Sequence, residues 1–265
     1  MWDGQAPDGR QVLVRCHRGL GDTIQFARYL PLLAQRAASV TLEAPRHLLP
    51  LFASFAGIAR LLPFDPAHPA PASDCDIEIT ELGFVLRAPP GAAPPPYLHA
   101  QPAAPLSTST VGLCHASGAW DAGRDLAAEL LRPICQRHAC LTLVAAPSTL
   151  PVGNPQGCPL DIIATAALVA ALDLVITVDT MIAHLAGALG RPTWLLLQHA
   201  PDWRWVPGAR ATPWYPSMRL YHQPCPGDWE AVIAMVEHDL VAFPQTQGAP
   251  AIDRLAEPVR SCLVG

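Results

Sequence analysis

Short apolar runs alternate with longer amphipathic segments along this chain, and this alternation limits the folds that it can adopt. In the first half we expect strands at 11–16, 39–43, 59–63 and 75–79, with helices at 23–35 and 46–55. In the second half we expect strands at 111–114, 140–145, 174–178, 193–197 and 219–222, with helices at 126–137, 162–171, 182–189 and 229–241. Strands that alternate with helices form parallel sheets with helices on their faces. The pattern therefore predicts an α/β fold.

A segment rich in proline and alanine, Arg87–Thr110, divides the alternation into two series. Proline disfavours a helix interior, so this segment is predicted to be an extended linker. The resulting division is an N-terminal Rossmann-like domain (1–88), the linker (89–110), a C-terminal Rossmann-like domain (111–245) and a weakly patterned tail (246–265). The cleft between the two domains is the expected ligand site.

Composition excludes several functional classes. All 17 cationic residues are arginine, which excludes a Schiff-base lysine, pyridoxal phosphate chemistry and a Walker A loop. The net charge is −5 without a basic stripe, so nucleic acid is not an expected partner. No apolar run is long enough to cross a bilayer, and the N-terminus lacks the pattern of a signal peptide, which predicts a cytoplasmic protein. The eight cysteines include no C-x-x-C pair and are expected to be reduced, without a zinc site.

The turn after the first expected strand carries the first candidate site. The sequence "RCHRGLGDTIQFARYLPLL" runs from a strand end through Gly19, Gly21 and Asp22 into a helix. Glycine permits positive φ and close backbone approach, and a helix N-terminus attracts anions. An aspartate at this point also serves as an N-cap without any function, and the local pattern favours that interpretation.

A second candidate site lies in "LVITVDTMIAHLAGALGRPTWLLL". A buried strand ends at Asp179, Thr180 begins a helix, and His184 follows one turn later on the same face. These groups would meet at the carboxyl edge of a parallel sheet, where open α/β folds bind ligands. Alternatively, Asp179 or Thr180 is a cap and His184 a packed core residue, and spacing alone does not decide between the two.

Two further motifs have both a functional and a structural interpretation. Asp74 and Asp76 form a D-x-D pair, which chelates a metal in one class of sugar-transferring enzymes, but the alternation that follows favours charges facing solvent. Four aromatic residues crowd the loop region before the last strand: Trp203, Trp205, Trp214 and Tyr215. They would stack on a sugar or base, or form a plug against the domain edge, and we favour the plug.

Three segments together resemble glycosyltransferase family 9, the ADP-heptose:lipopolysaccharide heptosyltransferase-like group, in the version often found after tetratricopeptide repeats. They are "GLGDTIQFARYLPLLAQR", "LDLVITVDTMIAHLAGALGRPTWLLL", and "PDWRW" followed by "PWYPSMRLYHQPCPGDWEAVI". The resemblance implies a GT-B architecture, in which two Rossmann-like parallel-sheet domains face each other across a cleft. It also implies catalysis without a bound metal or any cofactor beyond a nucleotide-sugar donor, with an ADP-linked sugar as one candidate.

The resemblance also assigns roles to residues. Asp22 corresponds to the proposed general base on the acceptor hydroxyl, in a turn shaped by Gly19, Gly21 and Thr23. The residues that correspond to the donor side are Asp179, Thr180 and His184. We add Arg124 and Ser117, which follow the strand expected at 111–114, as further donor-binding candidates. An acceptor hydroxyl needs a base as its new bond forms, and a diphosphate leaving group needs its growing charge met by donors already in place.

The donor side departs from the family pattern. In "VGLCHASGAWDAGRDLAAEL" His115 replaces an aromatic residue, an asparagine-rich portion is missing, and Arg124 is the only cation. The stretch between Ala146 and Asp161 is also short. The leading hypothesis is transfer of a heptose-like sugar or hexose from a nucleoside diphosphate to a glycan, lipid-linked or protein hydroxyl. The alternative is a catalytically degenerate domain that binds a nucleotide sugar or a protein, and peripheral contact with the inner membrane face is left open.

Overall fold

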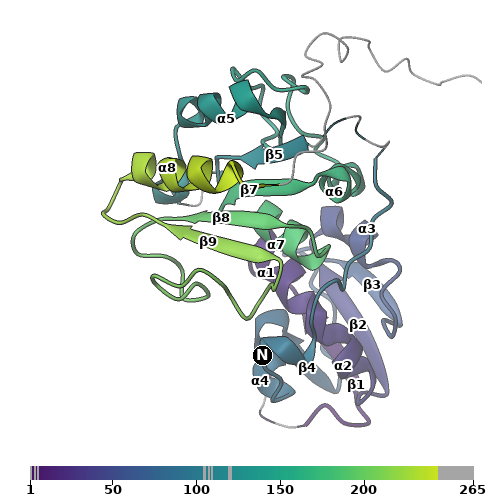
Figure 1. Cartoon of the computed structure of the whole chain (residues 1–265). Helices are drawn as coiled ribbons and strands as arrows, with labels where there is room; N and C mark the ends of the chain where they lie inside the picture. The colour runs from purple at the N-terminus through teal and green to yellow at the C-terminus, as the bar shows by residue number, and fades with distance from the viewer. Residues whose placement is uncertain are drawn as a thin grey trace, which may run out of the picture.

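The computed structural model describes residues 2, 4, 6–103, 106, 108, 110–118 and 121–243, and the predicted tail at 246–265 lies outside them. The chain forms two α/β units, each built on a parallel sheet (Figure 1). The first sheet has the order β3-β2-β1-β4, with all pairs parallel. Its strands are β1 (Gln11–Arg15), β2 (Ser39–Ala44), β3 (Arg60–Pro63) and β4 (Cys75–Glu78).

The second sheet has five parallel strands in the order β6-β5-β7-β8-β9. Its strands are β5 (Thr110–Cys114), β6 (Ala139–Thr142), β7 (Leu174–Val178), β8 (Thr193–Leu197) and β9 (Met218–His222). Every residue of β5, β7 and β8 is buried, as expected for central strands covered on both faces. All strands lie within a few residues of their predicted positions, which confirms the α/β fold.

Proline divides three of the predicted helices into a 3-10 turn and a short α-helix. The segment predicted as one helix at 23–35 is α1 (Leu20–Phe26), a 3-10 turn (Ala27–Tyr29) and α2 (Leu30–Ala34). The same pattern gives α3 (Leu49–Phe52) after Arg46–Leu48, and α5 (Arg132–Arg137) after Ala128–Leu131. Each α-segment has proline in its first turn, where its missing N–H is tolerated.

The remaining helices are α4 (Leu82–Val85), which the sequence pattern did not predict, α6 (Ile162–Ala171), α7 (Met181–Ala188) and α8 (Trp229–Leu240). Of these, α4 directly follows a 3-10 turn (Ile79–Glu81), and the other three are continuous. Aspartate caps define two of them, because Asp161 accepts a hydrogen bond from Ala164 N at 2.8 Å and Asp228 from Ala231 N at 3.0 Å. Among the described residues, no helix is long and apolar enough to cross a membrane.

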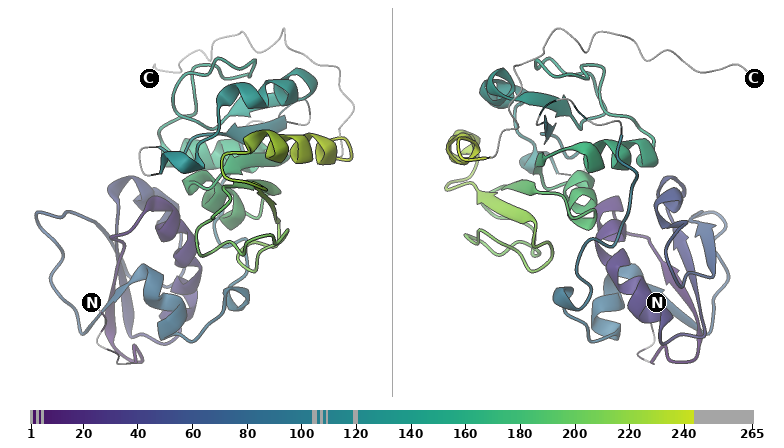
Figure 2. Two further views of the ribbon diagram at one scale, coloured as in Figure 1. Left: turned by 90° about the vertical axis from the view of Figure 1, so that its left-hand side faces the viewer. Right: turned by 45° about the vertical axis from the view of Figure 1, so that its right-hand side comes forward.

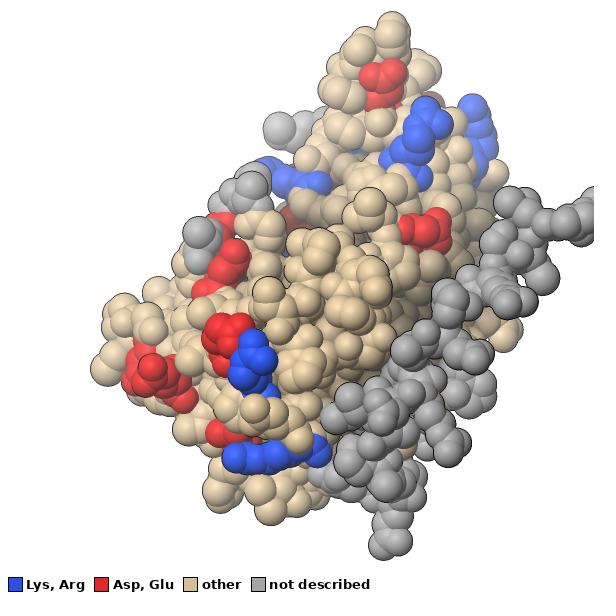
Figure 3. Space-filling model, turned by 90° about the horizontal axis from the view of Figure 1, so that it is seen from above, with Lys and Arg blue, Asp and Glu red and all other residues tan. Residues whose placement is uncertain are grey.

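The two units meet through α1 and α7, which pack directly against each other. Figures 1 and 2 show these helices between the two sheets, with the purple elements of the first unit on one side and the green elements of the second on the other. The packed helices therefore set the distance between loops at the carboxyl edges of both sheets. On the face drawn in Figure 3, most of the surface is uncharged, and the charged side chains on it are both acidic and basic.

The proline-rich linker is attached to this contact rather than free. Leu98 is 3% exposed, and the N–H groups of Tyr97 and Leu98 donate to Ala188 O at 3.1 and 3.2 Å. The Tyr97 hydroxyl donates to Ile24 O in α1 at 3.1 Å. The described part of the linker also contains a 3-10 turn, Pro90–Ala92, where an extended chain was predicted. It therefore fastens the two units together where they meet.

Candidate active site

Asp22 lies in the first turn of α1, just beyond the carboxyl end of β1. The helix begins at Leu20 with Gly19 as its N-cap, so the interpretation of Asp22 as the N-cap was wrong. Asp22 Oδ2 instead reaches back and accepts a hydrogen bond from Gly19 N at 3.0 Å. Its other oxygen, Oδ1, forms an ion pair with Arg204 of the second domain. One carboxylate oxygen therefore serves the helix terminus and the other faces the opposite domain.

The glycines of this turn are needed for space, not for positive φ. Gly19 has φ −64°, and neither Gly19 nor Gly21 is among the described residues with positive φ, so that part of the prediction was wrong. A Cβ on Gly21 would lie 2.7 Å from His184 Cδ2, closer than packing allows. Thr23 is fully buried, and its hydroxyl lies 3.2 Å from Gly19 O. The turn is thus fitted closely against α7.

Asp179 and Thr180 stand where the sequence placed them, directly after β7. Thr180 is the N-cap of α7, and its Oγ1 accepts a hydrogen bond from Ile182 N at 3.1 Å. Asp179 is 7% exposed, and its burial raises the pKa of its carboxyl, opposed by the nearby charge of Arg124. The capping interpretation of Thr180 is therefore confirmed, while its contact with a donor stays a prediction.

His184 is packed at the domain interface. Its side chain is buried, its Nδ1 lies 3.0 Å from the Tyr215 hydroxyl, and its ring stacks on Trp205 at a centroid distance of 5.8 Å. Burial, with help from surrounding guanidinium charges, lowers the pKa of His184 to about 3, so the ring is neutral near pH 7. The structure places this side chain against Gly21 in α1 and not at an exposed surface.

The two remaining donor-side candidates lie on the loop after β5. Ser117 Oγ is 2.6 Å from Asp125 Oδ1, so its hydroxyl is engaged within its own loop. Arg124 forms ion pairs with three carboxylates, to Asp121 at 3.2 Å, Asp179 at 3.3 Å and Asp202 at 3.8 Å. The structure therefore brings Arg124 to Asp179 with its charge already compensated, and the contact of Arg124 with a donor stays a prediction.

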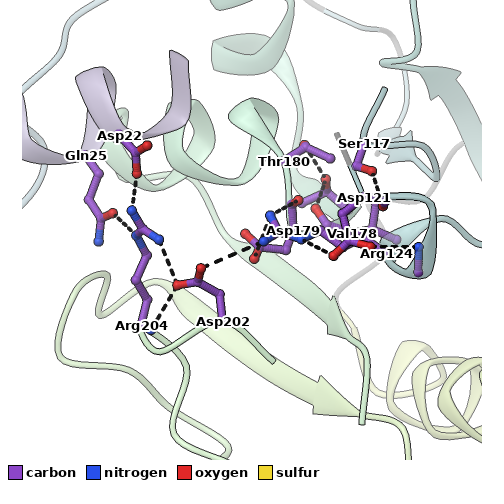
Figure 4. A network of polar contacts seen from close by, with 12 residues as sticks. Asp22, Gln25, Ser117, Asp121, Arg124, Val178, Asp179, Thr180, Asp202 and Arg204 are labelled. Atoms are coloured by element: carbon purple, nitrogen blue, oxygen red, sulfur yellow. Dashed lines mark hydrogen bonds and ion pairs between the residues drawn. The ribbon is translucent and has the colours of Figure 1, made fainter. Parts of the chain in front are cut away.

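Arg204 connects the two domains and was not identified from the sequence. Its Nη2 contacts Asp22, its Nη1 lies 2.7 Å from Asp202 Oδ1, and its Nε lies 2.6 Å from Gln25 Oε1. Figure 4 shows the result, a chain of alternating charges from Asp22 on α1 to Asp179 after β7. Arg204 stands in "PDWRW", one of the quoted motifs, but nothing in its spacing indicated that it would reach a residue 182 positions away.

This chain of charges, which we call the ionic clasp, consists of Asp22, Arg204, Asp202, Arg124, Asp179 and Asp121. Two guanidinium groups in it compensate four carboxylates. Guanidinium groups are well suited to bind phosphate oxygens, but here each is already paired with carboxylate oxygens. An anionic ligand would have to replace some of these pairs.

The aromatic residues divide into a plug and one exposed ring. Trp205, Trp214 and Tyr215 are at most 9% exposed, which confirms the plug for these three. Trp203 is 68% exposed. Its ring lies edge to face with Trp214 at 6.1 Å, and Arg204 Cζ lies 4.8 Å from its centroid.

A second arginine that the sequence did not single out, Arg28, lies inside the domain interface. It is 1% exposed, its Nη1 donates to Trp214 O at 2.8 Å, and its Nε donates to Gln25 O at 2.9 Å. Its Cζ lies 5.0 Å from the Tyr97 ring and 4.8 Å from the Tyr215 ring. Arg28 thus joins α1, the linker and the aromatic plug.

The D-x-D pair does not form a chelating site. Asp76 is ion-paired with Arg15 at 2.7 Å, and Asp74 Oδ2 accepts a hydrogen bond from Gln11 N at 3.3 Å. Asp76 therefore does not simply face solvent, as the alternation had suggested, because it compensates an arginine of the neighbouring strand β1. In the part of the chain that the structure describes, no group of three or more His, Cys, Asp or Glu side chains is arranged to hold a metal.

Comparison with known proteins identifies related sequences. Residues 158–222 match the family model described as "Glycosyltransferase family 9 (heptosyltransferase)". The chain is 37% identical over 94 residues to Protein FlbA of Caulobacter vibrioides. This alignment covers 35% of the chain and 15% of FlbA, so the chain spans a small part of the length of that relative.

Solved structures share the fold at low identity. A glycosyl transferase family 9 protein from Veillonella parvula aligns over 88% of this chain and 91% of its own, with a TM-score of 0.60 and 13% identity. E. coli heptosyltransferase WaaC aligns over 88% of this chain and 100% of its own, with a TM-score of 0.59 and 12% identity. E. coli TibC, described as an iron-containing dodecameric glycosyltransferase, aligns over 86% of this chain and 66% of its own, with a TM-score of 0.61 and 13% identity.

These likenesses agree with the geometry of the two parallel-sheet units. The predicted GT-B arrangement of two Rossmann-like domains is confirmed by the sheets themselves and by the shared fold. The family match begins in the loop before α6 and covers α6, β7, α7, β8 and β9, so it includes Asp179, Thr180 and Arg204. The resemblance noticed in the sequence is therefore confirmed: residues 158–222 match the model of glycosyltransferase family 9, and the chain shares its fold with a solved protein of that family.

Proposed function

We propose that this domain transfers a sugar from a nucleoside diphosphate donor to a hydroxyl group of an acceptor. The family match supports the reaction class. One WaaC structure is described with ADP-2-deoxy-2-fluoro heptose and one TibC structure with ADP-D-beta-D-heptose, so an ADP-linked heptose is the first donor to test. Glycan, lipid-linked and protein hydroxyls are the acceptor classes to screen. The seven free cysteines among the described residues fit a reducing compartment such as the cytoplasm.

The position of Asp22 Oδ1 carries this proposal. It is a carboxylate oxygen at the carboxyl edge of the first sheet, directed at the loops of the second domain. In the proposed reaction Asp22 accepts the proton of the acceptor hydroxyl while that oxygen bonds to the anomeric carbon of the sugar. The bond from the anomeric carbon to the diphosphate oxygen breaks, and the nucleoside diphosphate leaves.

The leaving group gains negative charge in this step, and positive groups must stabilise it. The candidates are Arg204, Arg124 and the N-terminal end of α7 beside Thr180. Two guanidinium groups supply the positive charge that a metal provides in other transferases. We therefore propose a reaction without a metal or a further cofactor.

Replacement of Asp22 by asparagine tests the proposal. Asp22→Asn keeps the shape of the side chain and removes the base, so we expect transfer to fall about 10²–10⁴-fold while ADP still binds. The measurements are sugar transfer with ADP-heptose and calorimetry with ADP. The matched control is Asp8→Asn, which breaks an exposed ion pair with Arg36 and should leave transfer unchanged. Equal transfer by wild type and Asp22→Asn would contradict the role of Asp22.

A second function is a domain that binds a nucleotide sugar or a protein without transfer. One specific observation favours it, namely that the two arginines of the ionic clasp are outnumbered by four carboxylates. Such a site would hold a diphosphate weakly. Saturable binding of ADP-heptose to wild type, with no transfer to any acceptor class, would be the result that selects this second function.

A further inference from the structure

Both oxygens of the proposed base are occupied in this structure. Asp22 Oδ2 accepts the N–H of Gly19 at 3.0 Å, and Oδ1 is paired with Arg204. The Arg204 side chain is 12% exposed and covers Oδ1 from the side of the second domain (Figure 4). The Asp22 side chain is 24% exposed, so an acceptor hydroxyl that reaches Oδ1 has to compete with Arg204 for it.

Arg204 has a second anionic partner that indicates where it would move. Asp202 lies between the two arginines of the clasp, with Oδ1 2.7 Å from Arg204 Nη1 and Oδ2 3.8 Å from Arg124 Nη2. A single anionic group at this point thus contacts both guanidiniums. A diphosphate is a stronger partner for arginine than a carboxylate, because it carries more charge and more acceptor oxygens.

The surroundings of Arg204 fit a side chain that exchanges partners. The Trp203 ring stacks on its guanidinium and is itself 68% exposed, so one face of the arginine is supported while the loop stays at the surface. Gln25 Oε1 accepts from Arg204 Nε at 2.6 Å and provides a neutral partner in α1. These contacts stabilise the guanidinium near Asp22.

We propose that Arg204 is a positioning residue that pairs with Asp22 in the ligand-free protein and exchanges Asp22 for the diphosphate of a bound donor. Asp22 Oδ1 is then released from its ion pair and available to an acceptor hydroxyl once the donor has bound. This inference rests on the proposed function, because it assigns an order to the two substrates of that reaction. It also makes Asp22 a competitor of the diphosphate for the same guanidinium group.

If Asp22 competes with the diphosphate for Arg204, removing Asp22 should tighten diphosphate binding. A merely structural ion pair would not give this gain in affinity. We would titrate inorganic pyrophosphate and ADP into wild type, Asp22→Asn, Arg204→Gln and the double variant by calorimetry. Asp22→Asn should bind pyrophosphate at least about threefold more tightly, because its competitor is gone, and Arg204→Gln about tenfold more weakly. In the Arg204→Gln background, Asp22→Asn should change the affinity less than about twofold, because the effects of interacting residues are not additive.

The double-mutant cycle of Asp22→Asn and Arg204→Gln separates this exchange from the general effect of removing a negative charge. If Asp22 acted only through long-range repulsion, its replacement would tighten binding equally in both backgrounds. Arg210→Gln is the matched control, since this arginine is ion-paired with Asp239 at 2.9 Å in the same chain segment and is 49% exposed. Its affinity for pyrophosphate should equal that of wild type.

The outcomes distinguish this inference from the proposed function. Additive effects, an unchanged affinity in Asp22→Asn, or no binding of either probe by any variant would overturn the exchange. Coupled affinities with no sugar transfer by wild type would support the exchange and contradict the transferase. Sugar transfer together with additive affinities would support the transferase and contradict the exchange alone.

Discussion

Two arginines connect the domains of this protein, and they do so in opposite ways. Arg28 is enclosed by aromatic rings and backbone carbonyl oxygens at 1% exposure. Arg204 is paired with carboxylates at the edge of the same interface, in contact with an exposed tryptophan. A buried cation with neutral partners stays in place, whereas a partly exposed cation among carboxylates can change partners. The comparison distinguishes Arg28, which fixes the two domains together, from Arg204, which is available for chemistry.

The largest expected effect tests the enclosed arginine. Arg28→Met removes the donors to Trp214 O and Gln25 O while keeping much of the side-chain volume. The Trp214 carbonyl loses its Arg28 donor inside the interface, whereas Gln25 O keeps the Tyr97 hydroxyl at 3.3 Å. We expect the free energy of unfolding to fall by about 3 kcal/mol, measured by urea denaturation. Arg60→Met, at an exposed position on β3, is the control and should change it by less than about 0.5 kcal/mol. Equal stabilities would show that Arg28 does not fix the domains.

The histidine beside this arginine gives a pH dependence of intermediate size. Burial lowers the pKa of His184 from 6.5 to about 3 in the folded protein. Below pH 6.5 the unfolded chain gains a proton that the folded chain does not, so this contribution to stability is lost as pH falls from 6.5 towards 3. Between pH 7 and pH 5 we expect the stability of wild type relative to His184→Gln to fall by about 2 kcal/mol. A constant difference across that range would contradict burial of a neutral His184.

The smallest expected effect on stability belongs to the exchangeable arginine. Arg204→Gln breaks the two partly exposed ion pairs to Asp22 and Asp202, and we expect a loss of less than about 1 kcal/mol in the free energy of unfolding. Urea denaturation of Arg204→Gln and Arg28→Met side by side measures the contrast directly. A loss for Arg204→Gln as large as that for Arg28→Met would remove the distinction between a fixed and an exchangeable contact.

The strands and the candidate loops were predictable because their signals are local. Apolar runs such as those of β5, β7 and β8 fix which residues are buried on both faces, and the capping hydroxyl of Thr180 acts within its own turn. Proline in the first turn of α2 also has a local effect, yet the pattern was interpreted there as one continuous helix. The position of Asp22 was predicted, but its partners were not.

The sequence alone determined the two series of strands, the turn that carries Asp22 and the resemblance to glycosyltransferase family 9. The tertiary structure decided which residues of the two domains meet. Gly21 lies against His184, Arg28 reaches the carbonyl oxygen of Trp214, and Arg204 reaches Asp22 only because α1 packs on α7. Hydrophobic periodicity records which face of a segment is buried, but not which distant segment covers it, because that depends on the packing of the whole interface.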